Sequence, residues 1–243
     1  TLMRSSAASD VYKRQVEYCH LRKVSLKSIG LIIVAAIFLF IMADYVNACS
    51  MIAFQNLLDD SLQAIVNKPV EALVVVAILP AIIEEFLFRG MIYRGIANKS
   101  NKKIVIIISA LLFAFLHMNF NQMCYAFVMG LVFAIVIYLT DNLSVSILLH
   151  MLFNAFTVII TCFEKSNAIQ AILQCNIAGY TLFNPSLTDT QGKIEISLLI
   201  IGGLIAILSA VIAGWLILLI AKTEKTTETT INNENIPVSY THL

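Results

Sequence analysis

Long runs of apolar residues alternate with short polar stretches along most of this chain. Six runs approach or exceed the roughly 20 residues that a helix needs to cross a bilayer. They lie at residues 28–49, 70–93, 104–120, 122–140, 143–163 and 195–221. We therefore expect an all-α fold, a polytopic membrane helical bundle of about six transmembrane helices, in which a core of four helices carries the polar motifs.

Short connections and flanking charges predict how these helices are arranged. The third, fourth and fifth runs are separated only by residues 119–122 and 141–142, so they should form tight antiparallel hairpins. Small residues every four positions in the fourth run, Ala126, Gly130 and Ala134, should let a neighbouring helix approach closely. Most Lys and Arg residues flank one side of the predicted bundle, which places both termini in the cytoplasm.

Composition excludes several classes of protein. Hydrophobic residues make up 59% of the 243 residues and charged residues 13%, and the mean hydropathy is +0.86. A water-soluble domain could not cover so much apolar surface, so membrane lipid is the expected surrounding. The formal net charge of +1, with no basic run interleaved with aromatics, predicts no nucleic-acid partner. Five scattered cysteines form no CxxC motif or disulfide framework.

The two ends differ from the rest of the chain. Residues 1–15 and the last seven residues resemble translated linker sequence, and we expect them to be non-native. Residues 16–221 should form one membrane domain with its motif core at 70–163. The polar segment 222–243, rich in Thr, Glu and Asn, is expected to be disordered.

Three ionisable residues, Glu84, Glu85 and Arg89, lie close together within the second apolar run. An ionisable side chain in a membrane helix costs several kcal/mol, so it normally faces a protein interior or a water-filled cavity. Glu85 and Arg89 are four residues apart and should form an ion pair on one helix face. Glu84 points about 100° away around the helix. Its carboxylate is therefore free to face another group and to act as a general base.

Two further runs carry polar groups suited to catalysis. The third ends in His117, four residues after Phe113, and the fifth contains His150 and Asn154 on one helix face. Each also has a structural interpretation: a single buried histidine usually satisfies a core hydrogen bond, and an asparagine can simply bond across helices. Glu84 has no such partner in the sequence, which favours a functional role.

Taken together, the ordered set EExxxR at 84–89, FxxxH at 113–117 and HxxxN at 150–154 resembles the motifs of the CPBP family. This family contains the type II CAAX prenyl endopeptidases and the Abi-like, bacteriocin-processing intramembrane proteases. The resemblance implies that Glu84 with His117 activates a water molecule, and that His150 and Asn154 bind the developing oxyanion. It also implies that the ion pair of Glu85 and Arg89 supports the site.

Several questions stay open at the level of sequence. Glu84, His117 and His150 could instead bind a divalent metal such as zinc, because zinc proteases need three protein ligands plus water. The substrate would be a membrane-associated peptide or protein, and the family name suggests a prenylated one. We expect a multi-pass protein of a bacterial plasma membrane. The alternatives are a non-proteolytic bacteriocin-immunity or scaffold protein, and a proton-coupled transporter.

Overall fold

The protein is a bundle of helices, as the apolar runs predict. A computed structural model describes residues 18–54, 65, 67–97 and 101–234. Residues 1–15 and the last seven residues, which we expect to be non-native, lie outside the described residues. The elements are α2 (Leu26–Met51), α4 (Pro69–Ala72), η1 (Leu73–Ile78), α5 (Leu79–Glu85), η2 (Phe86–Tyr93), α6 (Arg94–Ala97), α7 (Lys102–Leu116), α8 (Phe120–Thr140), α9 (Leu143–Cys162), α10 (Asn167–Leu173), β1 (Asn176–Ile177), β2 (Tyr180–Thr181) and α11 (Ile196–Glu234).

Four helices are long and apolar enough to cross a membrane: α2, α8, α9 and the part of α11 at Ile196–Thr227. The second predicted run forms an unbroken helical stretch over 69–97, in which η1 and η2 are π-helical. The third run forms α7, which has 15 residues. The multi-pass helical class is therefore confirmed, and the number of six spans stays a prediction.

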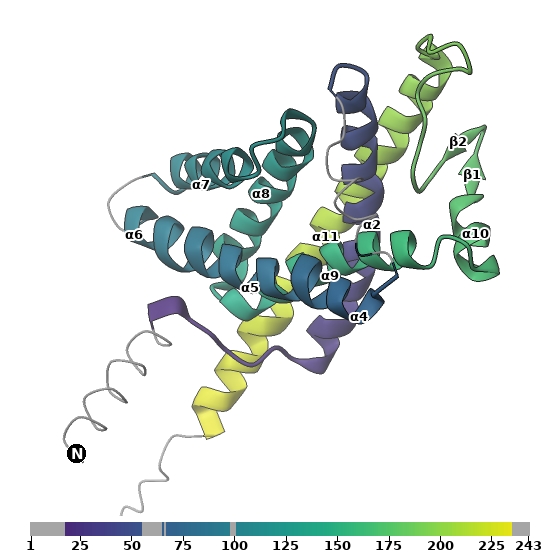
Figure 1. Cartoon of the computed structure of the whole chain (residues 1–243). Helices are drawn as coiled ribbons and strands as arrows, with labels where there is room; N and C mark the ends of the chain where they lie inside the picture. Colours follow the sequence, from purple (N-terminus) through teal and green to yellow (C-terminus); the bar gives the residue numbers. More distant parts are fainter. Residues whose placement is uncertain (1–17, 55–64, 66, 98–100, 235–243) are drawn as a thin grey trace, which may run out of the picture.

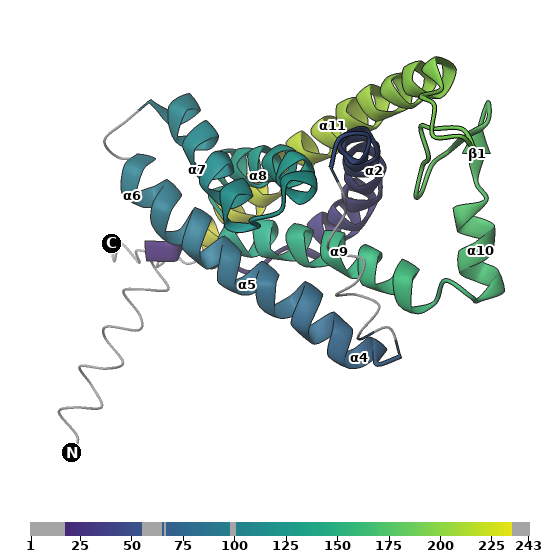
Figure 2. The ribbon, with the colours of Figure 1, turned by 45° about the horizontal axis from the view of Figure 1, so that its top comes forward.

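The long helices pack around one apolar core. The antiparallel helices α2 and α11 lie side by side, and α8 and α9 pack against α2 (Figure 1). Fully buried side chains from α2, α8 and α9 meet there, among them Ile32, Leu39, Met129, Phe133 and Leu149. The helical stretch 69–97 crosses this group and lies along α9 (Figure 2). This contact brings the charged motif against the core.

A close approach joins α7 to α8. A Cβ atom added to Gly130 would lie 3.1 Å from the backbone Cα of Ala110 and 3.2 Å from its carbonyl oxygen. Ala126 and Ala134, one helical turn away on either side, are buried. The small-residue spacing therefore serves helix packing, as expected.

We predict that Gly130→Ala separates α7 from α8. The added methyl group meets backbone atoms, which cannot move aside as a flexible side chain can. The variant should lose about 1–3 kcal/mol of unfolding free energy, measured as the thermal unfolding midpoint in detergent. Gly214→Ala is the matched control, because no heavy atom lies within 4 Å of its added Cβ. Equal midpoints for the two variants would contradict the prediction.

The end of the chain corrects one expectation. We expected residues 222–243 to be disordered, but residues 222–234 are helical because α11 continues to Glu234, and residues 235–243 lie outside the described residues. Glu224 is buried and accepts hydrogen bonds from the Ser25 backbone N–H (3.2 Å) and from Asn142 Nδ2 (3.0 Å). The Thr223 hydroxyl donates to the carbonyl four residues earlier, at 2.9 Å. Polar residues extend this helix because they find tertiary and local partners, which composition alone does not reveal.

A cluster of charges closes the turn between α8 and α9. Asp141 has a left-handed backbone conformation (φ 50°) and receives hydrogen bonds from Arg94 Nη1 at 2.9 Å and His20 Nδ1 at 2.6 Å. Burial raises the pKa of Asp141, but the hydrogen bonds and positive charges of Arg94 and His20 outweigh it and lower this pKa below its usual value. The ionised carboxylate therefore stabilises the fold.

We predict a pH-dependent effect of Asp141→Asn. Asparagine tolerates the left-handed conformation, so the variant removes charge without straining the turn. Because the folded-state pKa is depressed, the stabilisation is present above the unfolded-state pKa and is lost as pH falls through the folded-state value. Asp141→Asn should lower the unfolding midpoint at pH 7 by roughly 1–3 °C. The difference from wild type should shrink below about pH 4, and a pH-independent difference would contradict this assignment.

Candidate active site

The centre of the site is a buried ion pair on the helical stretch 69–97. Arg89 Nη1 donates to Glu85 Oε1 at 2.8 Å, and both side chains are 0% exposed. They lie four residues apart, which is the spacing that predicts a pair. Arg89 Nη2 donates to the carbonyl oxygen of Gly130 at 2.9 Å. The guanidinium also lies 4.5 Å from the ring centre of Phe113 and 5.3 Å from that of Phe133. Arg89 thus connects three helices.

Glu85 has further partners on α9. Its Oε2 accepts a hydrogen bond from Ser146 Oγ at 2.6 Å, and its Oε1 lies 3.0 Å from His150 Nδ1. A carboxylate paired with Arg89 is ionised and can only accept, so His150 Nδ1 carries a proton. The imidazole ring also stacks on Phe133, with ring centres 4.6 Å apart. These contacts determine the orientation of His150 and leave its Nε2 atom facing away from Glu85.

Glu84 occupies a different environment from its neighbour. Its side chain is 19% exposed, and its Oε2 lies 3.9 Å from His150 Nε2. That distance is too long for a direct hydrogen bond, but a water molecule can contact both atoms at once. Glu84 and Glu85 therefore approach the two nitrogens of one imidazole from different sides.

His117 and Asn154 are also held in place by backbone carbonyls. His117 follows the last residue of α7, and its Nδ1 lies 2.9 Å from the Phe113 carbonyl oxygen. A carbonyl accepts, so Nδ1 carries the proton and Nε2 keeps a lone pair. Asn154 Nδ2 donates to the Val76 carbonyl at 3.3 Å. Pro80 has no N–H with which to bond that carbonyl in an α-helix, and the π-helical segment η1 ends just before it.

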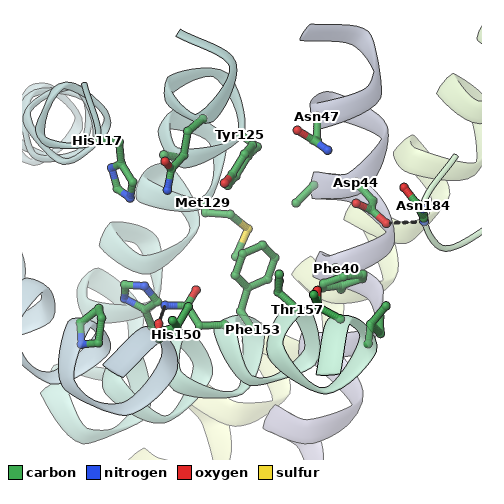
Figure 3. A pocket seen from close by; sticks show the side chains of 18 of the residues that line it. Phe40, Asp44, Asn47, His117, Tyr125, Met129, His150, Phe153, Thr157 and Asn184 are labelled. Carbon is green, nitrogen blue, oxygen red and sulfur yellow. Dashed lines mark hydrogen bonds between the residues drawn. The ribbon is translucent and has the colours of Figure 1, made fainter. Parts of the chain in front are cut away.

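A cavity of about 530 Å³ joins these groups. Glu84, His117, His150 and Asn154 all line it, together with residues of α2 and α8. Figure 3 shows His117 and His150 on one side and Phe40, Asp44 and Asn47 of α2 on the other. Three helical elements far apart in sequence thus present four candidate residues to one space.

The side chains of the cavity include potential metal ligands. Among the residues that the structure describes, no three His, Cys, Asp or Glu side chains form a group that could hold one. Glu84 and His150 approach each other, whereas no ion-pair contact joins either of them to His117 in the described part of the chain. The arrangement therefore has two of the three protein ligands that a zinc site needs.

Part of this chain is similar to known proteins. Residues 66–156 match a family model described as type II CAAX prenyl endopeptidase Rce1-like. The chain is also 34% identical over 116 residues to the membrane-embedded CAAX protease MroQ of Staphylococcus aureus, an alignment that covers 45% of this chain. The chain spans 47% of the length of that relative. No solved structure matches.

Residues 66–156 of this chain are therefore similar to the Rce1-like family. The matched residues contain all three motifs and the helices that carry them, from the stretch 69–97 to residue 156 within α9. The resemblance to the CPBP family is thereby confirmed. With its apolar helices, the chain is a multi-pass membrane protein.

Three contacts of the site were not predicted from the sequence. Ser146 binds Glu85, Phe133 stacks on His150, and the Gly130 carbonyl accepts from Arg89. Ser146 could have been found, because it lies one helical turn before His150 on the same face of α9. The other two depend on how α8 packs against its neighbours, and a ring or a backbone carbonyl leaves no polar signal in the sequence.

We predict strong and non-additive effects of removing the buried charges. Arg89→Met leaves Glu85 without its countercharge, and Glu85→Gln leaves Arg89 without its own. Each single variant should lose about 3–5 kcal/mol of stability, measured by thermal unfolding in detergent. The double variant Glu85→Gln/Arg89→Met should be more stable than the sum of the two losses implies, because it leaves no unpaired charge. Strictly additive losses would show that the two groups do not interact.

Proposed function

We propose that this protein is an intramembrane endopeptidase that hydrolyses a peptide bond near the membrane surface. The observation that carries the proposal is the position of Glu84. Its carboxylate lines a cavity, 3.9 Å from an imidazole whose other nitrogen binds a buried carboxylate. Such an arrangement can hold a water molecule and accept its proton.

Glu84 is the general base in this mechanism. It is partly exposed to the cavity, and Glu85 already provides the countercharge for Arg89. Glu84 is thus the carboxylate that is free to take a proton from water. His117, on the same cavity wall, keeps an Nε2 lone pair and assists the base by accepting or relaying that proton.

His150 and Asn154 would stabilise the oxyanion, with His150 in its doubly protonated form, because Nδ1 donates to Glu85 and Nε2 must donate to the oxyanion. In the tetrahedral intermediate the attacking oxygen and the oxyanion are bonded to the same carbon atom. A group 3.9 Å from Glu84 can therefore contact the oxyanion while Glu84 contacts the attacking oxygen. Asn154 lies one turn further along the same face of α9, and its second amide hydrogen is not used by Val76. Each such donor contributes on the order of 3 kcal/mol to the transition state.

Several finer features belong to the same proposal. The substrate is a membrane-associated peptide or protein, either a prenylated CAAX-type sequence or another peptide held at the bilayer. The protein lies in a bacterial plasma membrane, and both of its termini are in the cytoplasm.

We predict that Glu84→Gln abolishes hydrolysis without unfolding the protein. Glutamine keeps the volume and one hydrogen-bonding oxygen but cannot accept the proton. The rate of cleavage of a farnesylated CAAX peptide in proteoliposomes should fall by about 10²- to 10⁴-fold. Membranes that express wild type should contain new peptide termini that are missing with Glu84→Gln, measured by proteomic comparison of termini.

Glu71→Gln is the matched control, because Glu71 is exposed on α4 and does not line the cavity. Wild-type cleavage by Glu84→Gln, or identical termini in the two membranes, would overturn the proposal. The alternatives give different results: bacteriocin immunity through binding alone would survive Glu84→Gln at normal expression, and a transporter would show proton-driven uptake in proteoliposomes.

A further inference from the structure

The cavity has a second charged wall that the catalytic proposal does not use. Asp44 lies on α2, across the space from the two histidines (Figure 3). Its Oδ2 accepts a hydrogen bond from the backbone N–H of Asn184 at 2.8 Å. No Lys, Arg or His side chain forms an ion pair with Asp44 among the residues that the structure describes. Within the described part of the chain, the hydrogen-bond partner of Asp44 is therefore a neutral group.

The surroundings of Asp44 have an excess of negative charge. Glu84 and Glu164 line the same cavity, and the described lining contains no Lys or Arg. Asn47, one turn further along α2, also faces this space, and its Oδ1 has no hydrogen-bond partner among the described residues. Carboxylates and an unpaired amide oxygen accept hydrogen bonds and attract positive charge.

A carboxylate within an apolar helix that has no cation as its partner needs another group to offset its negative charge. Ionisable groups in membrane spans pair with an opposite charge or mark the path of a substrate. Asp44 lies within α2, seven residues before the helix ends at Met51, so it is not a charge at the end of the helix. A single neutral N–H stabilises a carboxylate less than a cation does. The occupant that completes the site is expected to carry a positive charge.

The position of Asp44 is fixed in advance of binding. Asn184 belongs to the segment between β2 and α11. Tyr180 of β2, just before this segment, is 1% exposed and packs against Tyr45, which anchors the segment. The Tyr45 hydroxyl donates to the Leu199 carbonyl at 2.9 Å. Since Asp44 Oδ2 already accepts a hydrogen bond from the Asn184 N–H, Asp44 Oδ1 is the oxygen that is left for a ligand. A fixed carboxylate binds a cation with less loss of entropy than a mobile one.

We propose that Asp44 is a specificity residue that binds a positively charged Lys or Arg side chain of the peptide substrate. This inference rests on the proposed endopeptidase function. The substrate would lie across the cavity, with the cleaved bond at Glu84 and His150 and the basic side chain at the wall formed by α2. Glu164 adds negative charge to the same cavity. Asp44 is separate from the hydrolytic step, because it faces the substrate from another helix.

The test uses the full-length chain in proteoliposomes and a matched set of farnesylated CAAX-type peptides. Each position next to the cleaved bond is occupied in turn by Lys, norleucine or Glu. Wild type should prefer Lys to norleucine at one position by about tenfold in kcat/KM, mainly through KM. In Asp44→Asn this ratio should fall toward one, because asparagine still accepts from the Asn184 N–H but carries no charge. Asp44→Lys should favour Glu at the same position.

Asp189→Asn is the matched control. Asp189 also accepts backbone N–H groups, from Gln191 and Lys193 at 2.8 and 2.9 Å, but it does not line the cavity. This variant should keep the wild-type preference. A wild-type enzyme indifferent to charge at every position, or an Asp44→Asn variant with an unchanged ratio, would overturn the inference. The second result would mean that Asp44 only anchors Asn184.

A binding measurement separates this inference from the catalytic proposal. Fluorescence anisotropy with labelled Lys and norleucine peptides is recorded on Glu84→Gln, which should not cleave them, and on Glu84→Gln/Asp44→Asn. Tighter binding of the Lys peptide that depends on Asp44 supports the specificity site even if wild type cleaves nothing. Equal binding of the two peptides to Glu84→Gln overturns the specificity site even if wild type is an active protease.

Discussion

The buried ion pair of Glu85 and Arg89 is the interaction on which the rest of this structure depends. Two charges buried without water are stable only when they pair with each other and most of their polar atoms are hydrogen-bonded. Glu85 therefore accepts hydrogen bonds from Ser146 and His150 of α9, and Arg89 donates to the Gly130 carbonyl of α8. The hydrogen bonds of this ion pair thus fix how the helical stretch 69–97 packs against α8 and α9. They also orient the imidazole of His150, which faces the cavity.

Helix geometry places the side chains of two adjacent glutamates in different environments. One residue along a helix is a rotation of about 100°, so Glu85 enters the protein interior while Glu84 enters the cavity. Glu85 has three side-chain partners and no exposure, whereas Glu84 is 19% exposed and lies 3.9 Å from His150. In the proposed mechanism, the buried carboxylate of Glu85 orients the histidine that lies beside the proposed base Glu84.

The cavity connects this centre to a part of the fold that carries none of the motifs. Asp44 and Asn47 of α2 form its opposite wall, and the segment before α11 contacts that wall through Asn184. Helix α2 is outside the matched family region of residues 66–156. Under the proposed function, we expect the groups that set substrate preference on α2 and this segment, and the hydrolytic groups within the matched region.

The sequence by itself determined the helical membrane class, the pairing of Glu85 with Arg89 and four polar residues that line the cavity, Glu84, His117, His150 and Asn154. It could do so because periodicity and the cost of buried charge are local properties of the chain. It did not determine the extension of α11 to Glu234, the approach of Glu84 to His150 or the acidic wall at Asp44. Those depend on contacts between helices more than 60 residues apart in sequence. Only tertiary packing decides which side chains share one cavity, since the same apolar faces could pack in other ways without changing any pattern in the sequence.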